Sequence, residues 1–200
     1  MVDIDEGIVA FDPSGTGQTG YFYFVNWENY EFGTITGENS VEHGESINSL
    51  IKTKQPKYVA WESSNILKMK YANADYMETV YLAGIIPFIC CINNISSDNC
   101  WTVNNLEVYS KVKDRKIGGL EQKLIQGKLG RPKNTFFFQN KAITEHEADA
   151  LAVFFILWTR ILKRLWIGKK INEIVNEPKL KRYNSLIRKS KRNLLNNKKV

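Results

Sequence analysis

The segment at residues 143–158 constrains the fold most, because it joins a helix start to a long apolar run. Thr144 is followed three residues later by Glu147, a capping-box pattern that predicts a helix with Thr144 as its N-cap. From residue 150 onward the segment is apolar nearly all round. The predicted helix is therefore expected to lie against the main core.

Two ionisable residues, His146 and Asp149, lie in the first turns of this predicted helix. Their spacing of three residues places both side chains on one helix face, near the free backbone N–H groups and the positive end of the helix dipole. Such a face can hold a metal ion or the phosphate of a substrate. A metal ion requires further carboxylates, which other segments must supply.

The residues before this helix predict strands and helices in alternation. Three strands are expected first, at residues 7–12, 21–25 and 31–36, with a turn at 13–20 between the first two. The pattern continues with a helix at 46–52, a strand at 57–61, a helix at 73–86, a strand at 88–92 and a helix from near Thr102. The predicted fold class is α/β, with a central mixed five-stranded sheet (antiparallel strands 1–3, then parallel strands) flanked by helices.

The segment at residues 111–134 is basic and contains four glycines. It is predicted to form short helices and loop outside the core. The three phenylalanines at 136–138 are expected to form either an edge strand or a hydrophobic anchor ahead of the capping-box helix.

Acidic residues from separate segments are expected to meet at one edge of the sheet. Asp12 and Glu62 stand at the C-terminal ends of predicted strands, the edge where active sites of such sheets gather. Together with Asp149 and the neighbouring His146 they form a cluster that a cation must neutralise. Hard oxygen ligands suit Mg²⁺, and His also admits Mn²⁺. Two such ions can clamp both oxygens of a phosphodiester, so metal-dependent phosphodiester hydrolysis is the inferred reaction.

Each of these residues also has a purely structural interpretation. Asp12 can simply open a turn, Glu62 can satisfy a local polar group, and His146 can be an ordinary first-turn helix residue. The joint arrangement of four residues on three segments favours the site.

The charge is distributed unevenly along the chain. The net charge is +7, but residues 160–200 hold 14 Lys and Arg against 2 Glu, and residues 111–141 hold 9 against 2 acids. A nucleic acid is the partner that explains both basic segments. A solvated cationic tail is the alternative. Within the tail, residues 179–195 can form a basic amphipathic helix, which is expected to contact phosphates rather than a membrane surface.

The remaining composition indicates a soluble cytoplasmic protein, bacterial or encoded by a virus. No signal pattern is visible, and the apolar runs at 83–92 and 150–158 are too short to span a bilayer. The three cysteines are Cys90, Cys91 and Cys100, and they lack zinc spacing, so buried free thiols are expected.

Three segments resemble the signatures of RuvC-type Holliday junction resolvases. They are residues 9–21 (VAFDPSGTGQTGY), 56–62 (PKYVAWE) and 146–151 (HEADAL), and the last is the most specific. The resemblance spans about residues 7–158. It implies a ribonuclease H-like nuclease domain at 1–166, followed by a basic extension at 167–200.

The resemblance also implies a mechanism and partners. Asp12, Glu62, His146 and Asp149 would be the catalytic and metal-binding residues, with two Mg²⁺ or Mn²⁺ ions per site. The substrate would be branched DNA, in particular a four-way junction, and the protein would be a homodimer with its interface at helix 73–86. No membrane and no small-molecule substrate are implied. Nucleic-acid-binding candidates are Lys111, Lys113, Lys123, Lys128, Arg131 and Lys133.

Other functions remain open at this point. Residues 12–17 could be the phosphate loop of an actin-like or sugar-kinase ATPase, although such enzymes duplicate this fold and need more than 200 residues. The chain could also be a noncatalytic module that binds branched DNA. A transposase or integrase core is possible, but no separate sequence-reading domain is apparent.

Overall fold

The computed structural model describes residues 7–63, 74–113, 117–126 and 132–175. At residues 113, 124–126, 132–134 and 168–175 it describes the backbone alone. The chain divides into two units, residues 1–157 and residues 158–200. The first unit contains all of the strands described below. The second contains the end of the last helix and the predicted basic extension.

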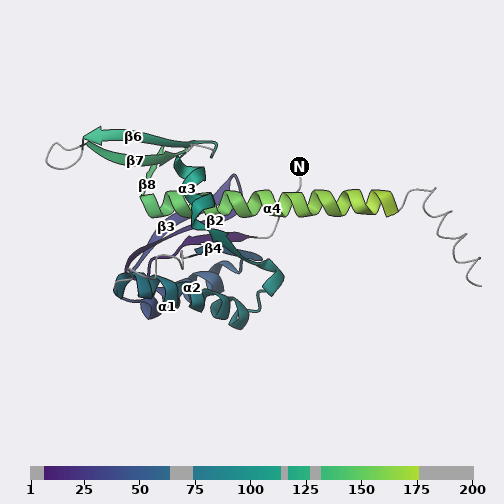
Figure 1. Ribbon diagram of the computed structural model, residues 1–200, viewed down its shortest axis with the longest axis horizontal. Helices are drawn as coiled ribbons and strands as arrows, with labels where there is room; N and C mark the ends of the chain where they lie inside the picture. The colour runs from purple at the N-terminus through teal and green to yellow at the C-terminus, as the bar shows by residue number, and fades with distance from the viewer. Residues whose placement is uncertain (1–6, 64–73, 114–116, 127–131, 176–200) are drawn as a thin grey trace, which may run out of the picture. The chain divides into compact units, whose positions relative to one another are not determined.

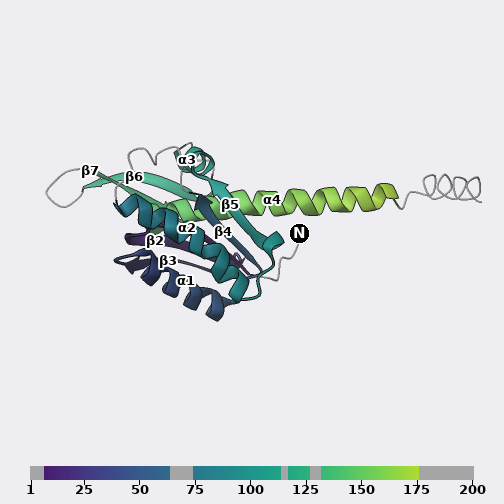
Figure 2. The same cartoon turned by 60° about the horizontal axis from the view of Figure 1, so that its bottom comes forward.

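The first unit is built on a mixed five-stranded sheet (Figures 1 and 2). Its strands are β1 (Ile8–Asp12), β2 (Gly17–Asn26), β3 (Asn29–Gly37), β4 (Tyr58–Ser63) and β5 (Cys100–Asn104). The spatial order is β3-β2-β1-β4-β5. β1 pairs antiparallel with β2 and parallel with β4, while β2–β3 is antiparallel and β4–β5 parallel. This is the ribonuclease H-like arrangement, and it confirms the predicted fold class.

Helices cover both faces of this sheet because its central strands are apolar on both sides (Figure 1). Helices α1 (Ser40–Lys54) and α2 (Ala74–Ile92) cover one face, where Val9 and Phe11 of β1 belong to a cluster with Ile47 of α1 and Leu82 of α2. Successive strand residues point to opposite faces, so Ile8 and Ala10 are buried on the other face.

The start of α4 (Glu145–Val175) packs on that other face of the sheet. The Phe154 ring lies 4.9 Å from the rings of both Phe22 and Phe24 of β2, measured between ring centroids. The capping box is confirmed: the Glu147 amide donates to Thr144 Oγ1 at 3.1 Å, and the Thr144 amide donates to Glu147 Oε2 at 2.6 Å. The sequence therefore located both the start of α4 and its role in the core.

The predicted strand at residues 88–92 is wrong, because α2 continues through Pro87 to Ile92. Proline disfavours a helix interior, since it removes one backbone hydrogen bond and crowds the preceding turn. The buried stripe nevertheless keeps its helical spacing across the proline, with Ile86 before it and Ile89 and Cys90 after it. Burial of this stripe against the sheet outweighs the local preference.

The fifth strand therefore comes later in the chain than predicted. It is β5, which follows a short 3₁₀ helix at Ser97–Asn99 and includes Thr102, the residue near which a helix was predicted. Helix α3 (Asn105–Lys113) begins after β5, and the Asn104 side chain accepts a hydrogen bond of 2.8 Å from the Leu106 amide. This side chain satisfies an amide in the first turn of α3.

A second, three-stranded sheet occupies most of the segment predicted as short helices and loop. It consists of β6 (Leu120–Gln126), β7 (Pro132–Phe138) and β8 (Lys141–Ile143), in the order β6-β7-β8 with antiparallel pairing. The prediction was wrong for β6 and for the start of β7. Residues 136–138, expected to form either an edge strand or a hydrophobic anchor, belong to β7, which is the central strand of this sheet. Buried Phe136 and Phe138 anchor β7, and the Phe138 ring packs edge-on against Phe22 of the main sheet at 6.3 Å.

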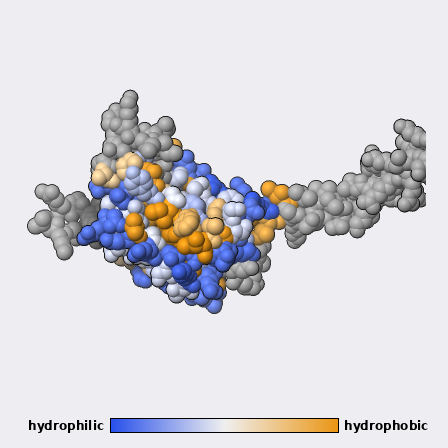
Figure 3. All heavy atoms as spheres, turned by 90° about the horizontal axis from the view of Figure 1, so that it is seen from below, coloured by the Kyte–Doolittle hydropathy of each residue, from blue (hydrophilic) through white to orange (hydrophobic). Residues whose placement is uncertain are grey.

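Helix α2 is unusual because one of its sides is apolar and exposed. Tyr81, Phe88 and Ile92 are 52%, 65% and 50% exposed, and their spacing places them along one stripe. Figure 3 shows apolar surface on the side of the molecule that carries α1 and α2. By length and composition alone α2 could cross a membrane. Its opposite side belongs to the core of the first unit, as expected of a helix in a globular domain.

Candidate active site

The site forms where the first turn of α4 crosses the end of β1. Asp12 is the last residue of β1, and its partner on β2 is Gly20. A Cβ atom at Gly20 would lie 2.1 Å from the carbonyl oxygen of His146, so only glycine lets the helix backbone come this close. Gly20 thus brings the first turn of α4 to the end of β1.

This close approach places the His146 side chain against Asp12. His146 Nδ1 lies 2.6 Å from Asp12 Oδ2, within hydrogen-bonding distance. The bond to Asp12 raises the pKa of His146, with smaller contributions from the charges of Asp12, Asp149 and Glu145, while burial acts in the opposite direction. His146 therefore retains a proton, and its positive charge, to higher pH than an ordinary histidine.

Asp149 lies one helical turn further on, in the same electrostatic environment. Burial raises its pKa from 3.8 to about 7, and the charges of Asp12 and Glu145 add to the rise, whereas His146 opposes it. At neutral pH the carboxyl group is thus near its titration midpoint. The nearby positive charge of His146 does not fully offset the effects of burial and of the neighbouring acids on this carboxyl group.

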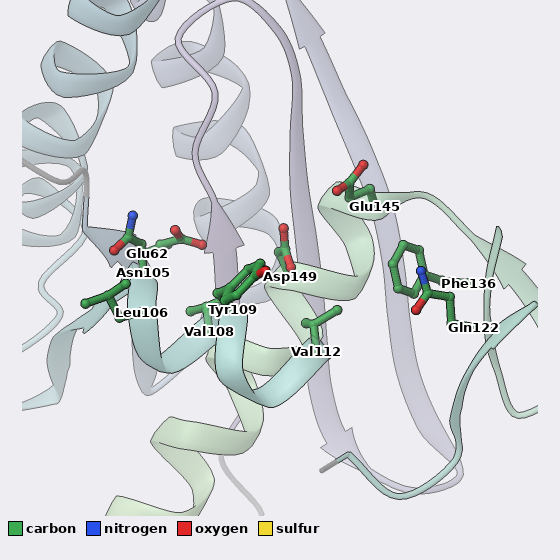
Figure 4. A pocket seen from close by; sticks show the side chains of 10 residues that line it. All are labelled: Glu62, Asn105, Leu106, Val108, Tyr109, Val112, Gln122, Phe136, Glu145 and Asp149. Atoms are coloured by element: carbon green, nitrogen blue, oxygen red, sulfur yellow. The ribbon is translucent and has the colours of Figure 1, made fainter. Parts of the chain in front are cut away.

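Glu62 is supplied by the parallel side of the sheet. It lies in β4 beside Val103 of β5. Together with Asp149 and Glu145 it lines a cavity of about 550 Å³ (Figure 4). The other lining residues are mostly apolar, and they are Asn105, Leu106, Val108, Tyr109, Val112, Gln122 and Phe136.

A second cavity, of about 480 Å³, adjoins the start of α4 and includes His146. The two cavities share Glu145 and Phe136 as lining residues. The second has a smaller share of apolar lining than the first, and its uncharged polar side chains include Gln18, Thr135 and Thr144. The start of α4 is therefore flanked by one mainly apolar cavity and one more polar cavity.

The structure accordingly brings together Asp12, His146 and Asp149, and places Glu62 on the cavity that Asp149 lines. Glu145 is an addition that the sequence pattern did not select, although its position beside His146 is visible in the sequence. Its neighbour Glu147 is buried and bonded to the Thr144 amide. Of these two glutamates, the one available to the cavity with Glu62 and Asp149 is Glu145.

The donor set suits a divalent cation by its chemistry. Carboxylate oxygens from three segments are the ligands that Mg²⁺ and Mn²⁺ accept. A bound cation would favour the ionised form of Asp149, which burial and the neighbouring acids disfavour. In the present geometry, no three His, Cys, Asp or Glu side chains of the described residues converge closely enough to hold a metal ion. Asp12 instead pairs with His146.

The loop after β1 shows little capacity to act as a nucleotide phosphate loop. Its amides at Ser14 and Gly15 donate to the hydroxyls of Thr19 and Thr79, each at 3.0 Å. A Cβ atom at Gly15 would lie 1.9 Å from the Glu78 carbonyl carbon, so the loop packs directly on the start of α2. A phosphate loop binds phosphate through free backbone N–H groups, and these two already have partners. The geometry therefore does not support the ATPase interpretation.

The predicted DNA-binding lysines are only partly described. Lys111 lies half-buried on α3, and exposed Lys123 on β6 forms an ion pair of 2.6 Å with Glu121. Lys113 and Lys133 are described by their backbone alone, and Lys128 and Arg131 lie outside the described residues. Neither Lys111 nor Lys123 lines the cavity of Glu62 and Asp149.

Comparison with known proteins gives a structural likeness without a sequence match. No protein-family model and no curated protein matches the chain. Among solved structures, Thermus thermophilus RuvC in complex with a Holliday junction substrate is 12% identical, with a TM-score of 0.49 over 74% of this chain and 89% of that chain. A second Thermus thermophilus RuvC structure is 14% identical, with a TM-score of 0.45 over 74% and 90%. Both scores are low, so the fold is defined here by its own strand order.

Proposed function

We propose that this protein is a metal-dependent, structure-selective endonuclease that hydrolyses phosphodiester bonds of branched DNA during recombination or repair. The observation that carries the proposal is the group of acids that β1, β4 and α4 bring to one edge of the sheet, with Glu62, Glu145 and Asp149 lining one cavity. The raised pKa of Asp149, about 7, supports it. Ionised carboxylates held close together repel one another, and a bound cation would neutralise them. Two divalent ions at such a site supply Lewis-acid charge and an activated water for phosphoryl transfer.

In this proposal Asp12, Glu62 and Asp149 hold the ions, with His146 as a possible fourth ligand and Glu145 as an adjacent acid. The chain's own contribution begins with Gly20, which fixes the start of α4 at the end of β1. His146 holds a proton between its Nδ1 atom and Asp12 and lines the more polar cavity. Before an ion binds, a cationic imidazole at that position would attract the phosphate of an incoming strand, whereas as a metal ligand His146 would be neutral.

The proposed substrate is a four-way junction, on the strength of the three sequence segments that resemble RuvC-type resolvases. Two opposed cuts require two copies of the site, and the exposed stripe of Tyr81, Phe88 and Ile92 on α2 offers a surface for a homodimer. The basic segments, including Lys111 and Lys123, would contact DNA phosphates. A cytoplasmic location stays a prediction.

The test is cleavage of a synthetic four-way junction and of a linear duplex, with Mg²⁺, Mn²⁺ or EDTA. We expect paired, symmetric, metal-dependent cuts in the junction alone. Asp12→Asn and Asp149→Asn should abolish cutting while junction binding survives. Asp98→Asn, an exposed residue of the 3₁₀ helix, is a matched control that should cut normally. Continued cutting by the Asp12 and Asp149 variants would refute the assignment of the site.

A noncatalytic module that binds branched DNA is the second candidate. One observation favours it: no three potential ligands among the described residues converge, and Asp12 is paired with His146. This alternative predicts junction binding that is indifferent to Mg²⁺ and no nicking in either metal. The same gel therefore separates the two functions.

A further inference from the structure

Helix α3 presents a short apolar stripe to the cavity that contains Glu62 and Asp149. Leu106 and Tyr109 are 66% and 60% exposed, and Val112 follows at the same spacing of three residues. All three side chains line the cavity, and Figure 4 shows them projecting from α3. Exposed leucine and tyrosine side chains in a cavity indicate a binding site, and they suit contact with an apolar part of a ligand.

The stripe is held in place by its own helix. The Asn104 side chain bonds the Leu106 amide at 2.8 Å, which fixes the first turn. Val108, which also lines the cavity, is only 2% exposed and packs α3 against the rest of the unit. The stripe is therefore displayed by an anchored element at the end of β5, next to the strand that carries Glu62.

The position of the acids restricts what the cavity can take. If the scissile phosphate lies at the metal-binding carboxylates, the adjoining nucleotides must occupy the space beside them. The apolar wall cannot replace the hydration of a phosphate, but it can accept the face of a base. The volume of about 550 Å³ falls within the usual range of ligand pockets, roughly 300 to 1,000 Å³.

The more polar neighbouring cavity indicates how a DNA strand would lie across the site. His146, Gln18 and Thr135 line it, and these groups suit sugar and phosphate oxygens. A strand passing over Glu145 and Phe136, which both cavities share, would leave a base on the α3 side and backbone on the other.

We propose that the cavity beneath α3 receives an unpaired base of a nucleotide next to the scissile phosphate, and that the Tyr109 ring stacks on that base. The proposal rests on the nuclease function proposed above and names the part of the substrate that the site selects. A base within a duplex is stacked on both sides and cannot enter. Branches, flaps and bubbles already contain unpaired bases, so little free energy is needed to unstack one. A cavity that binds such a base therefore selects these DNA structures over a linear duplex.

The experiment uses the full chain in EDTA with a set of four-way junctions. Each junction carries a single fluorescent base, 2-aminopurine, at a different position around the cut. With the wild type, we expect one position to show a fluorescence change on binding. Tyr109→Ala should lose this change and bind about 5- to 100-fold more weakly, the range expected for one stacked base. Tyr109→Phe is the matched control, because it keeps the ring and should behave as the wild type.

A junction with an abasic nucleotide at the reporting position separates stacking from a loss of structure. On it, wild type and Tyr109→Ala should bind equally. The role of Tyr109 is overturned if Tyr109→Ala loses the same affinity relative to the wild type on the abasic and the intact junction, or loses none on either. If that happens while the wild type still makes metal-dependent cuts, the nuclease function stands and only the base-binding inference fails. A wild type that binds no junction overturns both.

Discussion

Replacing Asp149 by asparagine should stabilise the metal-free protein, although it removes a proposed ligand. The folded-state pKa of Asp149 is about 7, against 3.8 without the fold. The folded protein therefore binds this proton more tightly than the unfolded chain does. Each pKa unit corresponds to about 1.4 kcal/mol, so the ionised group costs up to about 4 kcal/mol of unfolding free energy.

The pH dependence follows from the same pKa values. At pH values well below 3.8 the carboxyl group is neutral in both states, and the cost is absent. It grows as pH rises from about 4 to 7 and is then constant. Asparagine has almost the same shape and no charge, so the gain of Asp149→Asn over wild type should increase by about 3 kcal/mol between pH 5 and pH 8.

Urea unfolding in EDTA at these two pH values measures the difference, with Asp98→Asn as the control. Adding Mg²⁺ at pH 8 should stabilise the wild type and leave Asp149→Asn nearly unchanged, because a ligand that binds only the folded state stabilises it. The reasoning is refuted if Asp149→Asn is destabilised at pH 8, or if its difference from the wild type is the same at both pH values.

Three further changes test the geometry around the site and the proposed dimer. Gly20→Ala should lower the free energy of unfolding by about 1 to 3 kcal/mol, since its Cβ atom would clash with the start of α4. The control Gly84→Ala, whose Cβ meets nothing within 4 Å, should not lower it. Thr144→Ala should cost about 1 kcal/mol through loss of the α4 cap, and Thr144→Ser should cost little, both measured by urea unfolding. Phe88→Glu should turn a dimer into a monomer in sedimentation equilibrium, and a monomeric wild type would contradict this use of α2.

The errors in the sequence-based prediction have a common physical origin. Residues 88–92 were assigned to a strand because Pro87 precedes an apolar run, yet the run continues a helix whose stripe is buried by the sheet. Residues 120–126 lie between glycines at 118–119 and at 127, which favoured a loop, but their pairing with β7 makes them a strand. Both outcomes depend on partners that are distant in sequence.

The sequence by itself determined the features that depend on near neighbours. The capping box of Thr144 and Glu147 located the start of α4, and the strand ending at Asp12 and the acid at Glu62 were visible as local patterns. These features follow from hydrogen bonds and side-chain alternation within a few residues. The α/β class followed from their order along the chain.

The tertiary structure decided how these residues act on one another. Only the close approach at Gly20 brings His146 to within 2.6 Å of Asp12. Only burial beside other acids raises the pKa of Asp149 to about 7. Distances between segments and the removal of water are properties of the packed chain, because they arise only when residues more than a hundred positions apart are brought together.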